Sequence, residues 1–336
     1  MTLGPGWDII GDVHGHFELL ERLFDSMGYV RSSPYVWRHP SGRRPLFLGD
    51  MIDRGDFELT TVRTVMAMTR SGSALALMGN HEYNDLCDWL GLENFHRGER
   101  HVSFLRRIQN APDFEEILDW MMSLPLWLDL GPLRAVHACW DPEAMRAVSQ
   151  ALGGCRMSEA LFRRFNPPRG GETPREARRV HDALERVLSG IMLALPPGVT
   201  YRSRRGKLLR RVRVRWWDDR AASYRAAAFM ETPERVPPLP LEKSVCVFKP
   251  EKPTFFGHYN LCGLEPRPVS EFAACMDYGA GSGGALTAYR WCEDESGPLK
   301  AERFGQAGGG AGAQRSAFPL LEAFQEPGDR LRLAHA

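Results

Sequence analysis

Three short motifs in the first quarter of the chain contain side chains suited to metal ions and phosphate. They are Gly11-Asp12-Val13-His14-Gly15, Gly49-Asp50-Met51-Ile52-Asp53-Arg54-Gly55 and Gly79-Asn80-His81-Glu82. Carboxylate, imidazole and amide groups are metal ligands, and a guanidinium matches two phosphate oxygens at once. In this order, the motifs are typical of a site that cleaves phosphate esters with two metal ions.

The ligand types indicate how two cations would be held. Asp12 and His14 are two residues apart between glycines that permit a tight turn, and the two oxygens of Asp50 can bridge two ions. The residues that would complete the coordination of the second metal are Asn80, His137 and His258. Three imidazoles beside only two carboxylates favour manganese, iron or zinc over calcium and magnesium. We expect two divalent ions, with manganese first and iron and zinc as alternatives.

Three further residues of the motifs could act on the ester itself. His81 follows a proposed ligand and is placed to protonate the leaving oxygen. Asp53 would fix the tautomer of His81, and Arg54 would grip two phosphate oxygens. In the alternative interpretation, Asp53 and Arg54 form only a local salt bridge. Glu82 either supports the site or merely begins a helix, where acidic residues are favoured.

Each motif ends a short apolar run and precedes a helical pattern. The apolar runs that end at a motif or at a later histidine are 7–10, 45–48, 74–78, 133–136 and 254–256. Helical spacing follows over 16–29 and 57–69, and again from Tyr83. Repeated strand–motif–helix units gather their functional residues at the carboxyl ends of the strands.

Gly279–Gly284 matches the spacing G-x-G-x-x-G of dinucleotide-binding loops. The segment that follows, 285–291, has the pattern of a strand rather than a helix, and 273–277 before it is also strand-like. We therefore expect a hairpin turn here and no nucleotide cofactor.

At these residues the chain resembles the calcineurin-like metallophosphoesterases, and more closely their phosphoprotein phosphatase branch in its bacterial form. That branch contains GDxHG, GDxxDRG and GNHE, then a histidine after a strand and a later Gly-His, and all five occur here in order. The resemblance implies an α/β (α+β) fold, a β-sandwich flanked by helices with a two-metal site at the C-terminal ends of strands. The ligand sets that it implies are Asp12, His14 and Asp50 for one metal, and Asp50, Asn80, His137 and His258 for the other.

The chain departs from the family pattern beside two of these ligands. Cys139 stands where the family usually has glycine, and Tyr259 stands where it often has threonine. Neither residue is a ligand, so these departures leave the metals in place and bear on the shape of the pocket.

We expect one catalytic domain over residues 1–303, with an elaborated insertion at 141–253 inside it. The insertion is predicted to contain a helix over 177–195 and a strand over 208–217. Residues 304–336 include a glycine-rich run and are expected to form a flexible linker and tail.

A basic cluster lies inside the expected insertion, where eight of the fourteen residues from Arg202 to Arg215 are basic. It is interpreted first as a solvated strand face. The resemblance implies instead a second phosphate-contacting arginine, and the candidates are Arg204, Arg205, Arg211, Arg213 and Arg215. A third interpretation is a nucleic-acid groove in which Trp216 and Trp217 stack on bases. We also expect an aromatic wall near the metals, from Trp216, Trp217 or Tyr259.

Composition narrows the class of protein. The chain has 336 residues and a formal net charge of +1, which gives no reason to expect nucleic acid or a membrane as partner. Its seven cysteines form no Cys-x-x-Cys pair, and no secretory signal or long apolar span is visible. Reduced thiols and a cytoplasmic location are therefore expected.

The sequence thus predicts a cytoplasmic, metal-dependent phosphatase in which a metal-bound hydroxide attacks phosphorus and His81 is the general acid. The expected substrates are phosphate monoesters, either phosphoserine and phosphothreonine of a phosphorylated protein or a small phosphomonoester. These should be cleaved at least about tenfold more efficiently than diadenosine tetraphosphate. The nearest alternative is a diadenosine polyphosphate hydrolase. An alternative of another class is a non-catalytic, metal-dependent regulatory or RNA-end-binding module, in which His81 would have no role.

Overall fold

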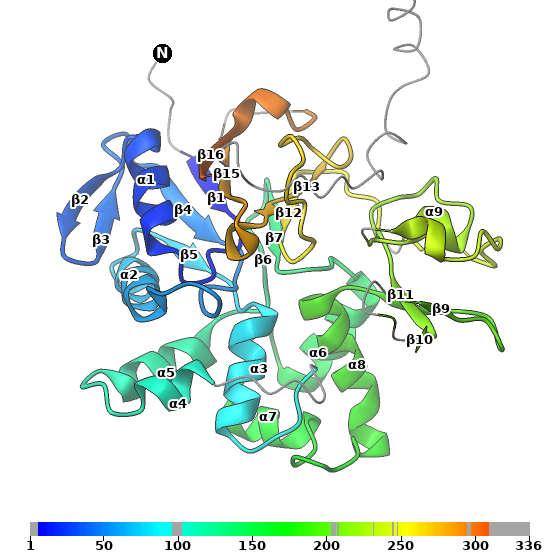
Figure 1. The fold of residues 1–336 in the computed structure, drawn as a ribbon. Helices are drawn as coiled ribbons and strands as arrows, with labels where there is room; N and C mark the ends of the chain where they lie inside the picture. Colours follow the sequence, from blue (N-terminus) through cyan, green and yellow to red (C-terminus); the bar gives the residue numbers. More distant parts are fainter. Residues whose placement is uncertain are drawn as a thin grey trace, which may run out of the picture.

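The computed structural model describes residues 6–95, 103–202, 206, 208–230, 232–243, 245–246, 248–293 and 297–308. Two β-sheets lie at the centre of this part of the molecule, with helices around them (Figure 1). The first sheet has the strand order β14-β15-β1-β4-β5, with β16 paired to β15, and the second has the order β13-β12-β7-β6. This arrangement confirms the two-sheet α/β fold flanked by helices that the resemblance implied.

The first sheet combines parallel and antiparallel strands. Its parallel strands are β1 (Gly6–Ile10), β4 (Arg44–Phe47) and β5 (Leu75–Ala76). Its antiparallel strands are β14 (Asp277–Tyr278), β15 (Ala285–Cys292) and β16 (Phe304–Gly308). The strands of the second sheet are β6 (Trp127–Asp129), β7 (Arg134–Val136), β12 (Thr254–Phe256) and β13 (Ala273–Cys275).

The sheets pack through a shared apolar layer. Ile9 and Leu46 of the first sheet belong to the same buried cluster as Ala135 and Phe255 of the second. Burial of such side chains is the main favourable contribution to folding. The layer brings the ends of strands from both sheets together, although those strands are far apart along the chain.

Helices surround the sheets on several sides (Figure 1). Those of the first half are α1 (Phe17–Met27), α2 (Glu58–Arg70), α3 (Asn80–Trp89), α4 (Phe104–Ile108) and α5 (Phe114–Ser123). Those of the expected insertion are α6 (Pro142–Leu152), α7 (Glu159–Phe165), α8 (Arg175–Ser189) and α9 (Tyr224–Ala227). Helix α1 buries the five apolar residues that its sequence spacing placed on one face, Leu19, Leu20, Leu23, Phe24 and Met27. No helix among the described residues has the length and apolar character needed to cross a membrane.

Short strands complete the structure. They are β2 (Val30–Ser33) with β3 (Val36–Arg38), β8 (Met192–Ala194) with β11 (Arg211–Arg213), and β9 (Tyr201–Arg202) with β10 (Leu208–Leu209). The single-turn 3₁₀ helices are Pro233–Arg235, Ala280–Ser282 and Ala301–Arg303. The segment Ala280–Ser282 joins the antiparallel strands β14 and β15, which confirms the hairpin predicted at the glycine-rich turn.

The predicted helix and strand of the insertion are wrong in their extents. Helix α8 ends at Ser189 and not at residue 195, because Gly190 adopts φ 77° and a Cβ atom there would lie 2.1 Å from Tyr259 Oη. The chain turns at this close contact and forms β8. The predicted strand 208–217 is divided between β10 and β11, and residues 214–217 lie beyond both strands.

The expected boundary at residue 304 is also wrong. Phe304–Gly308 form β16, which pairs along its whole length with β15, so the sheet continues five residues into the expected tail. Tyr289 and Phe304 pack with their ring centroids 5.1 Å apart, and this apolar contact fixes the start of the strand. The remainder of the predicted tail, 309–336, lies outside the described residues.

A buried ion pair stabilises the first sheet at the end where β1 begins. Asp8 and Arg43 have fully buried side chains, and Arg43 Nη2 donates to Asp8 Oδ1 at 2.7 Å. Tyr29 also donates to Asp8, at 2.7 Å, and Arg43 donates to the carbonyls of Trp7 and Trp291. The pair therefore ties β1 to the segment before β4 and to β15.

Replacing Arg43 by alanine should lower the free energy of unfolding by about 3–5 kcal/mol, because it removes the nearer cation of buried Asp8 and leaves the more distant Arg290 Nε at 3.4 Å. Urea titration followed by circular dichroism measures the change. Lys249→Ala, which removes a fully exposed partner of Asp219, is the control and should leave the midpoint unchanged. Equal midpoints for the two variants would contradict the assigned role of the buried pair.

Candidate active site

Backbone strain is concentrated at the residues that the sequence singles out. Among the described non-glycine residues, positive φ angles occur at His14, Asp50, Asp53, Arg54 and His258, with values from 50° to 74°. This left-handed conformation is costly for residues with a Cβ atom, and it persists where surrounding contacts hold it. All five lie in loops that follow β1, β4 or β12.

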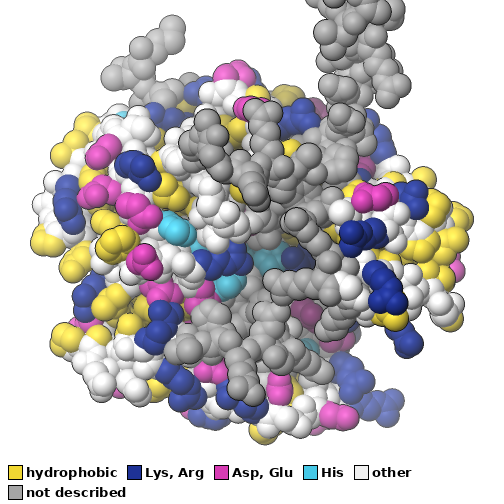
Figure 2. Space-filling view, viewed as in Figure 1, with side chains coloured by type: hydrophobic (Ala, Val, Ile, Leu, Met, Phe, Trp, Pro, Cys, Tyr) yellow, Lys and Arg dark blue, Asp and Glu magenta, His cyan; other side chains and the backbone are white. Residues whose placement is uncertain are grey.

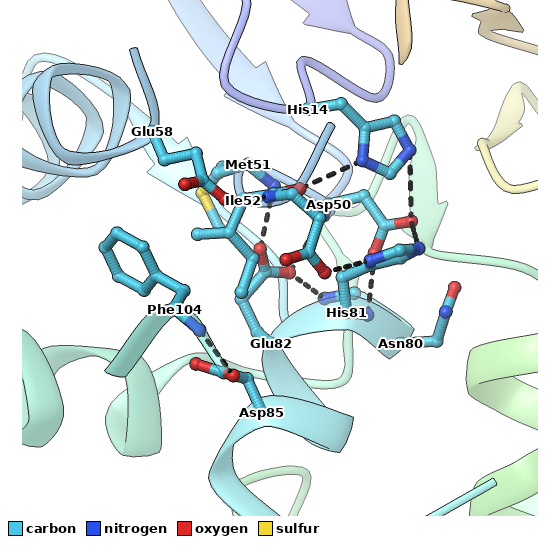
Figure 3. A network of polar contacts seen from close by, with 12 residues as sticks. His14, Asp50, Met51, Ile52, Glu58, Asn80, His81, Glu82, Asp85 and Phe104 are labelled. Carbon is cyan, nitrogen blue, oxygen red and sulfur yellow. Dashed lines mark hydrogen bonds and ion pairs between the residues drawn. The ribbon is translucent and has the colours of Figure 1, made fainter. Parts of the chain in front are cut away.

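Asp50 lies at the centre of the site and presents a different oxygen to each of two groups. Its Oδ2 is 3.7 Å from His14 Nε2, and its Oδ1 is 3.4 Å from His137 Nε2. Ligand atoms of His14, Asp50 and His81 lie within 4.8 Å of one another, as do those of Asp50, His137 and His258. Figure 3 shows His14 and His81 pointing toward Asp50. The carboxylate therefore has the geometry of a bridge between two cations.

The second group is completed by Asn80, the first residue of α3. Its Oδ1 lies 2.9 Å from His137 Nε2 and 2.7 Å from His258 Nδ1. Because His137 Nδ1 donates to the Leu48 carbonyl at 2.8 Å, the Nε2 of the neutral ring carries a lone pair that faces the amide oxygen. Two acceptors that face each other fit a metal site, because a cation between them would satisfy both.

The pKa values of the histidines fit this arrangement. Burial lowers the pKa of His14 to about 3, and it also lowers those of His137 and His258. The three rings are therefore neutral at physiological pH, which is the form that binds metals. His14 Nδ1 donates to the Ile52 carbonyl at 2.9 Å, so its Nε2 faces Asp50 as an acceptor.

Asp12 lies against the second group and is absent from both clusters just described. Its Oδ2 accepts the backbone N–H of His258 at 3.0 Å, while its buried Oδ1 has no hydrogen-bond partner in the part of the chain that the structure describes. Burial, with Asp277 and Asp50 close by, raises the pKa of Asp12. A buried carboxylate oxygen without a partner fits a cation ligand. The donor set thus fits two divalent ions, and the ligand role of each residue is our proposal.

His81 is held by Asp53, as the sequence predicts. His81 Nδ1 and Asp53 Oδ2 form a hydrogen bond, and His81 Nε2 lies 3.8 Å from Asp50 Oδ2. Burial alone would lower the pKa of His81, but the carboxylates of Asp50 and Asp53 raise it to about 9. The two carboxylates therefore favour the protonated ring, whose Nε2 faces Asp50.

Glu82 supports the site through the backbone. Its fully buried carboxylate accepts three N–H groups, from Gly79, Asp50 and Met51, at 2.7–2.9 Å. These bonds tie the loop after β4 to the start of α3 and hold Asp50 in its left-handed conformation (Figure 3). Of the two interpretations of Glu82, the supporting role agrees with these contacts.

The hairpin between β14 and β15 also contacts the site. A Cβ atom on Gly281 would lie 2.6 Å from His14 Cδ2 and 2.7 Å from Arg54 Cδ. Only glycine therefore fits between these side chains. Sequence reasoning identified the hairpin and missed this contact, for which the glycine spacing was the one available signal.

Of the five arginines proposed as a second phosphate contact, Arg213 on β11 is the one beside the histidines. Its charge is the second cause, after burial, of the lowered pKa of His258, and it also lowers that of His137. Its buried Nε has no hydrogen-bond partner among the described residues. Arg211 is exposed, Arg215 pairs with Asp218 at 3.1 Å, and Arg204 and Arg205 lie outside the described residues.

The expected aromatic wall and the stacking faces for nucleic acid are wrong. Trp216, Trp217 and Tyr259 are at most 5% exposed and pack on Phe256 and Phe229. They form core and offer no ring face to a ligand. Arg54, in contrast, is exposed at the edge of the site. Figure 2 shows histidine, acidic and basic side chains gathered near the centre of the face in view.

Residues 8–138 match the calcineurin-like phosphoesterase family model. Over these residues the chain is similar to the calcineurin-like phosphoesterases. It is 30% identical over 148 residues to a protein of Aromatoleum aromaticum named bis(5'-nucleosyl)-tetraphosphatase, symmetrical, covering 43% of this chain and 49% of that protein. A protein of Bordetella pertussis with the same name is 26% identical over 267 residues, covering 77% and 85%. The chain spans between 30% and 50% of the length of six of the curated relatives that it matches.

The fold is also similar to solved structures. The crystal structure of the cold-active protein-tyrosine phosphatase of a psychrophilic Shewanella species has a TM-score of 0.47 and 15% sequence identity, and the match covers 89% of this chain and 83% of that one.

Asp50→Asn should reduce the metal bound per chain from two ions toward one or none, because an amide bridges two cations poorly. Mass spectrometry of metal content after dialysis against manganese measures the change. Asp219→Asn, a substitution of an exposed surface carboxylate, is the matched control and should retain both ions. Two ions per chain in the Asp50 variant would show that the bridging assignment is incorrect.

Proposed function

We propose that the protein is a two-metal phosphoesterase and that dinucleoside polyphosphates are its preferred substrates. The observation that carries the proposal is the placement of Asp50, whose two oxygens face two different sets of imidazoles. Bound cations would lower the pKa of water and neutralise charge on the phosphate oxygens. Manganese stays our proposal for both positions because of the three imidazole ligands.

The chain's own residues suit the remaining parts of the reaction. Arg54 on one side and Arg213 on the other would bind phosphate oxygens and orient the phosphorus. His81, protonated and oriented by Asp53, would donate its Nε2 proton to the leaving oxygen. Glu82 holds Asp50 in position and touches no substrate.

The names of the two curated relatives support the polyphosphate class. Both are called symmetrical bis(5'-nucleosyl)-tetraphosphatases, so they favour the alternative considered from the sequence over the phosphoprotein phosphatase expectation. The structure supports the same choice, because the aromatic side chains expected to close the pocket are buried in the core. Two arginines near the candidate metal ligands would suit a chain of phosphates with several negative charges.

Phosphate monoesters are a second candidate, favoured by the raised pKa of His81. An alkoxide leaving group needs a proton far more than a phosphate leaving group does. A protonated imidazole held by a carboxylate is therefore most useful on an ester such as phosphoserine.

A cytoplasmic location also stays a proposal, supported by seven free cysteines.

A substrate panel with manganese tests the proposed function. Diadenosine tetraphosphate should be cleaved at least about tenfold more efficiently, by kcat/KM, than a phosphoserine peptide, a difference of about 1.4 kcal/mol in transition-state binding. His81→Ala should lose about 10²–10⁴-fold on the phosphopeptide and less on the dinucleotide. A preference for the phosphopeptide would reverse the substrate assignment, and equal rates with and without metal would contradict the two-metal mechanism.

Arg213→Ala should raise the inhibition constant of inorganic phosphate by about tenfold, the loss expected for a charged hydrogen bond of roughly 1.5 kcal/mol. Arg54→Ala should act in the same direction. Arg211→Ala is the matched control, since Arg211 is an exposed residue of the same strand, β11. Unchanged phosphate inhibition in the Arg213 variant would show that its guanidinium does not reach the substrate.

A further inference from the structure

The loop that carries Asp53 and Arg54 is held by a glutamate that the sequence motifs do not include. Glu58, near the start of α2, accepts the backbone N–H of Asp53 through Oε1 at 2.7 Å. Asp53 and Arg54 have φ angles of 70° and 74°, so this turn needs contacts that keep it in place. The bond from Glu58 is one such contact, and it fixes the backbone from which the Asp53 carboxylate reaches His81.

The charge of Glu58 is balanced by a residue far away in the chain. Arg107 of α4 donates through Nη2 to Glu58 Oε1 at 2.9 Å and through Nη1 to Glu58 Oε2. The same Nη2 lies 3.9 Å from Asp53 Oδ1. The Glu58 and Asp53 side chains are 9% and 7% exposed, so two neighbouring buried carboxylates share this one guanidinium. Buried carboxylates of like charge need a cation nearby.

Helix α4 is itself fixed to the helix that carries the candidate general acid. Asp85 of α3 accepts the backbone N–H groups of Phe104 and Leu105, both at 2.9 Å (Figure 3). Helix α3 begins with Asn80 and His81. Arg107 on α4 and His81 on α3 therefore lie on two helices that these hydrogen bonds hold together.

We propose that Arg107 is a positioning residue for proton donation, acting through Glu58 and Asp53 on His81. The proposal rests on the proposed function, in which His81 protonates the leaving group. In this arrangement Arg107 balances the charges of Glu58 and Asp53, which lie side by side. Glu58 then holds the Asp53 backbone, and the Asp53 carboxylate holds His81 Nδ1–H so that Nε2–H faces the ester oxygen. Arg107 touches neither substrate nor metal.

The consequence is a selective defect. Without Arg107, His81 loses its fixed orientation, while the groups proposed to bind metals and the guanidinium of Arg213 stay in place, because Glu58 holds none of them. The kcat for substrates with poor leaving groups should fall, and the kcat for substrates with good leaving groups should change little. A merely structural ion pair would affect all substrates alike.

The test compares Arg107→Gln with wild type on an alkyl phosphate and on p-nitrophenyl phosphate, with manganese. The variant should lose at least about tenfold in kcat on the alkyl phosphate, a part of the 10²–10⁴ that a general acid contributes, and less than about threefold on p-nitrophenyl phosphate. Arg107→Lys, which keeps the charge, should recover part of the loss. Arg106→Gln is the matched control, because the neighbouring Arg106 pairs with Asp88 on the surface and should leave both rates unchanged.

A readout without turnover separates this proposal from the proposed function. In protein with ¹⁵N-labelled histidine, the Nδ1–H of His81 should give a far-downfield proton resonance that Arg107→Gln shifts or removes and Arg106→Gln preserves. An unshifted resonance, or equal losses on the two substrates, would overturn the positioning role and leave the phosphoesterase proposal intact. If the wild-type protein with manganese cleaves no phosphoester, the proposed function fails, and the resonance alone decides the role of Arg107.

Discussion

The candidate site depends on the left-handed turn at Asp50, which the buried carboxylate of Glu82 holds. Three backbone N–H groups, two from the loop after β4 and one from Gly79, converge on that carboxylate. The Asp50 side chain is thereby fixed with one oxygen toward His14 and the other toward His137. Burial and the nearby charge of Asp50 raise the pKa of Glu82 to about 7, against the lowering effect of the three amides. A position held in this way can support pre-organised chemistry, because the cost of the strained backbone is met by folding.

Helix α3 supplies several of the polar groups that depend on this turn. Within six residues it supplies a candidate ligand, a candidate acid, the carboxylate that holds the Asp50 loop and the carboxylate that anchors α4, which are Asn80, His81, Glu82 and Asp85. The helix therefore relates the metal-facing groups to the polar network behind them. Side chains on one rigid element keep their relative positions better than side chains on separate loops.

The sequence could predict those parts of the candidate site that belong to short local motifs. Asp50, His81 and the histidines at strand ends lie where the motifs and apolar runs placed them. Contacts between distant segments were not predictable in the same way. Arg107 reaches Glu58 across 49 positions, and Gly281 meets His14 only because β14 and β15 close the first sheet. The spacing of Trp216 and Trp217 did not reveal whether their rings face substrate or core, because only the packing of Phe256 and Tyr259 against them decides that.

The central claim is that Asp50 bridges two metal ions, and anomalous diffraction at the manganese edge tests it most directly. The account predicts two anomalous peaks, roughly 3.5–4 Å apart, on either side of the Asp50 carboxylate. One should lie toward His14, and the other should lie between Asn80, His137 and His258. A single peak, or peaks that do not touch Asp50, would contradict the account.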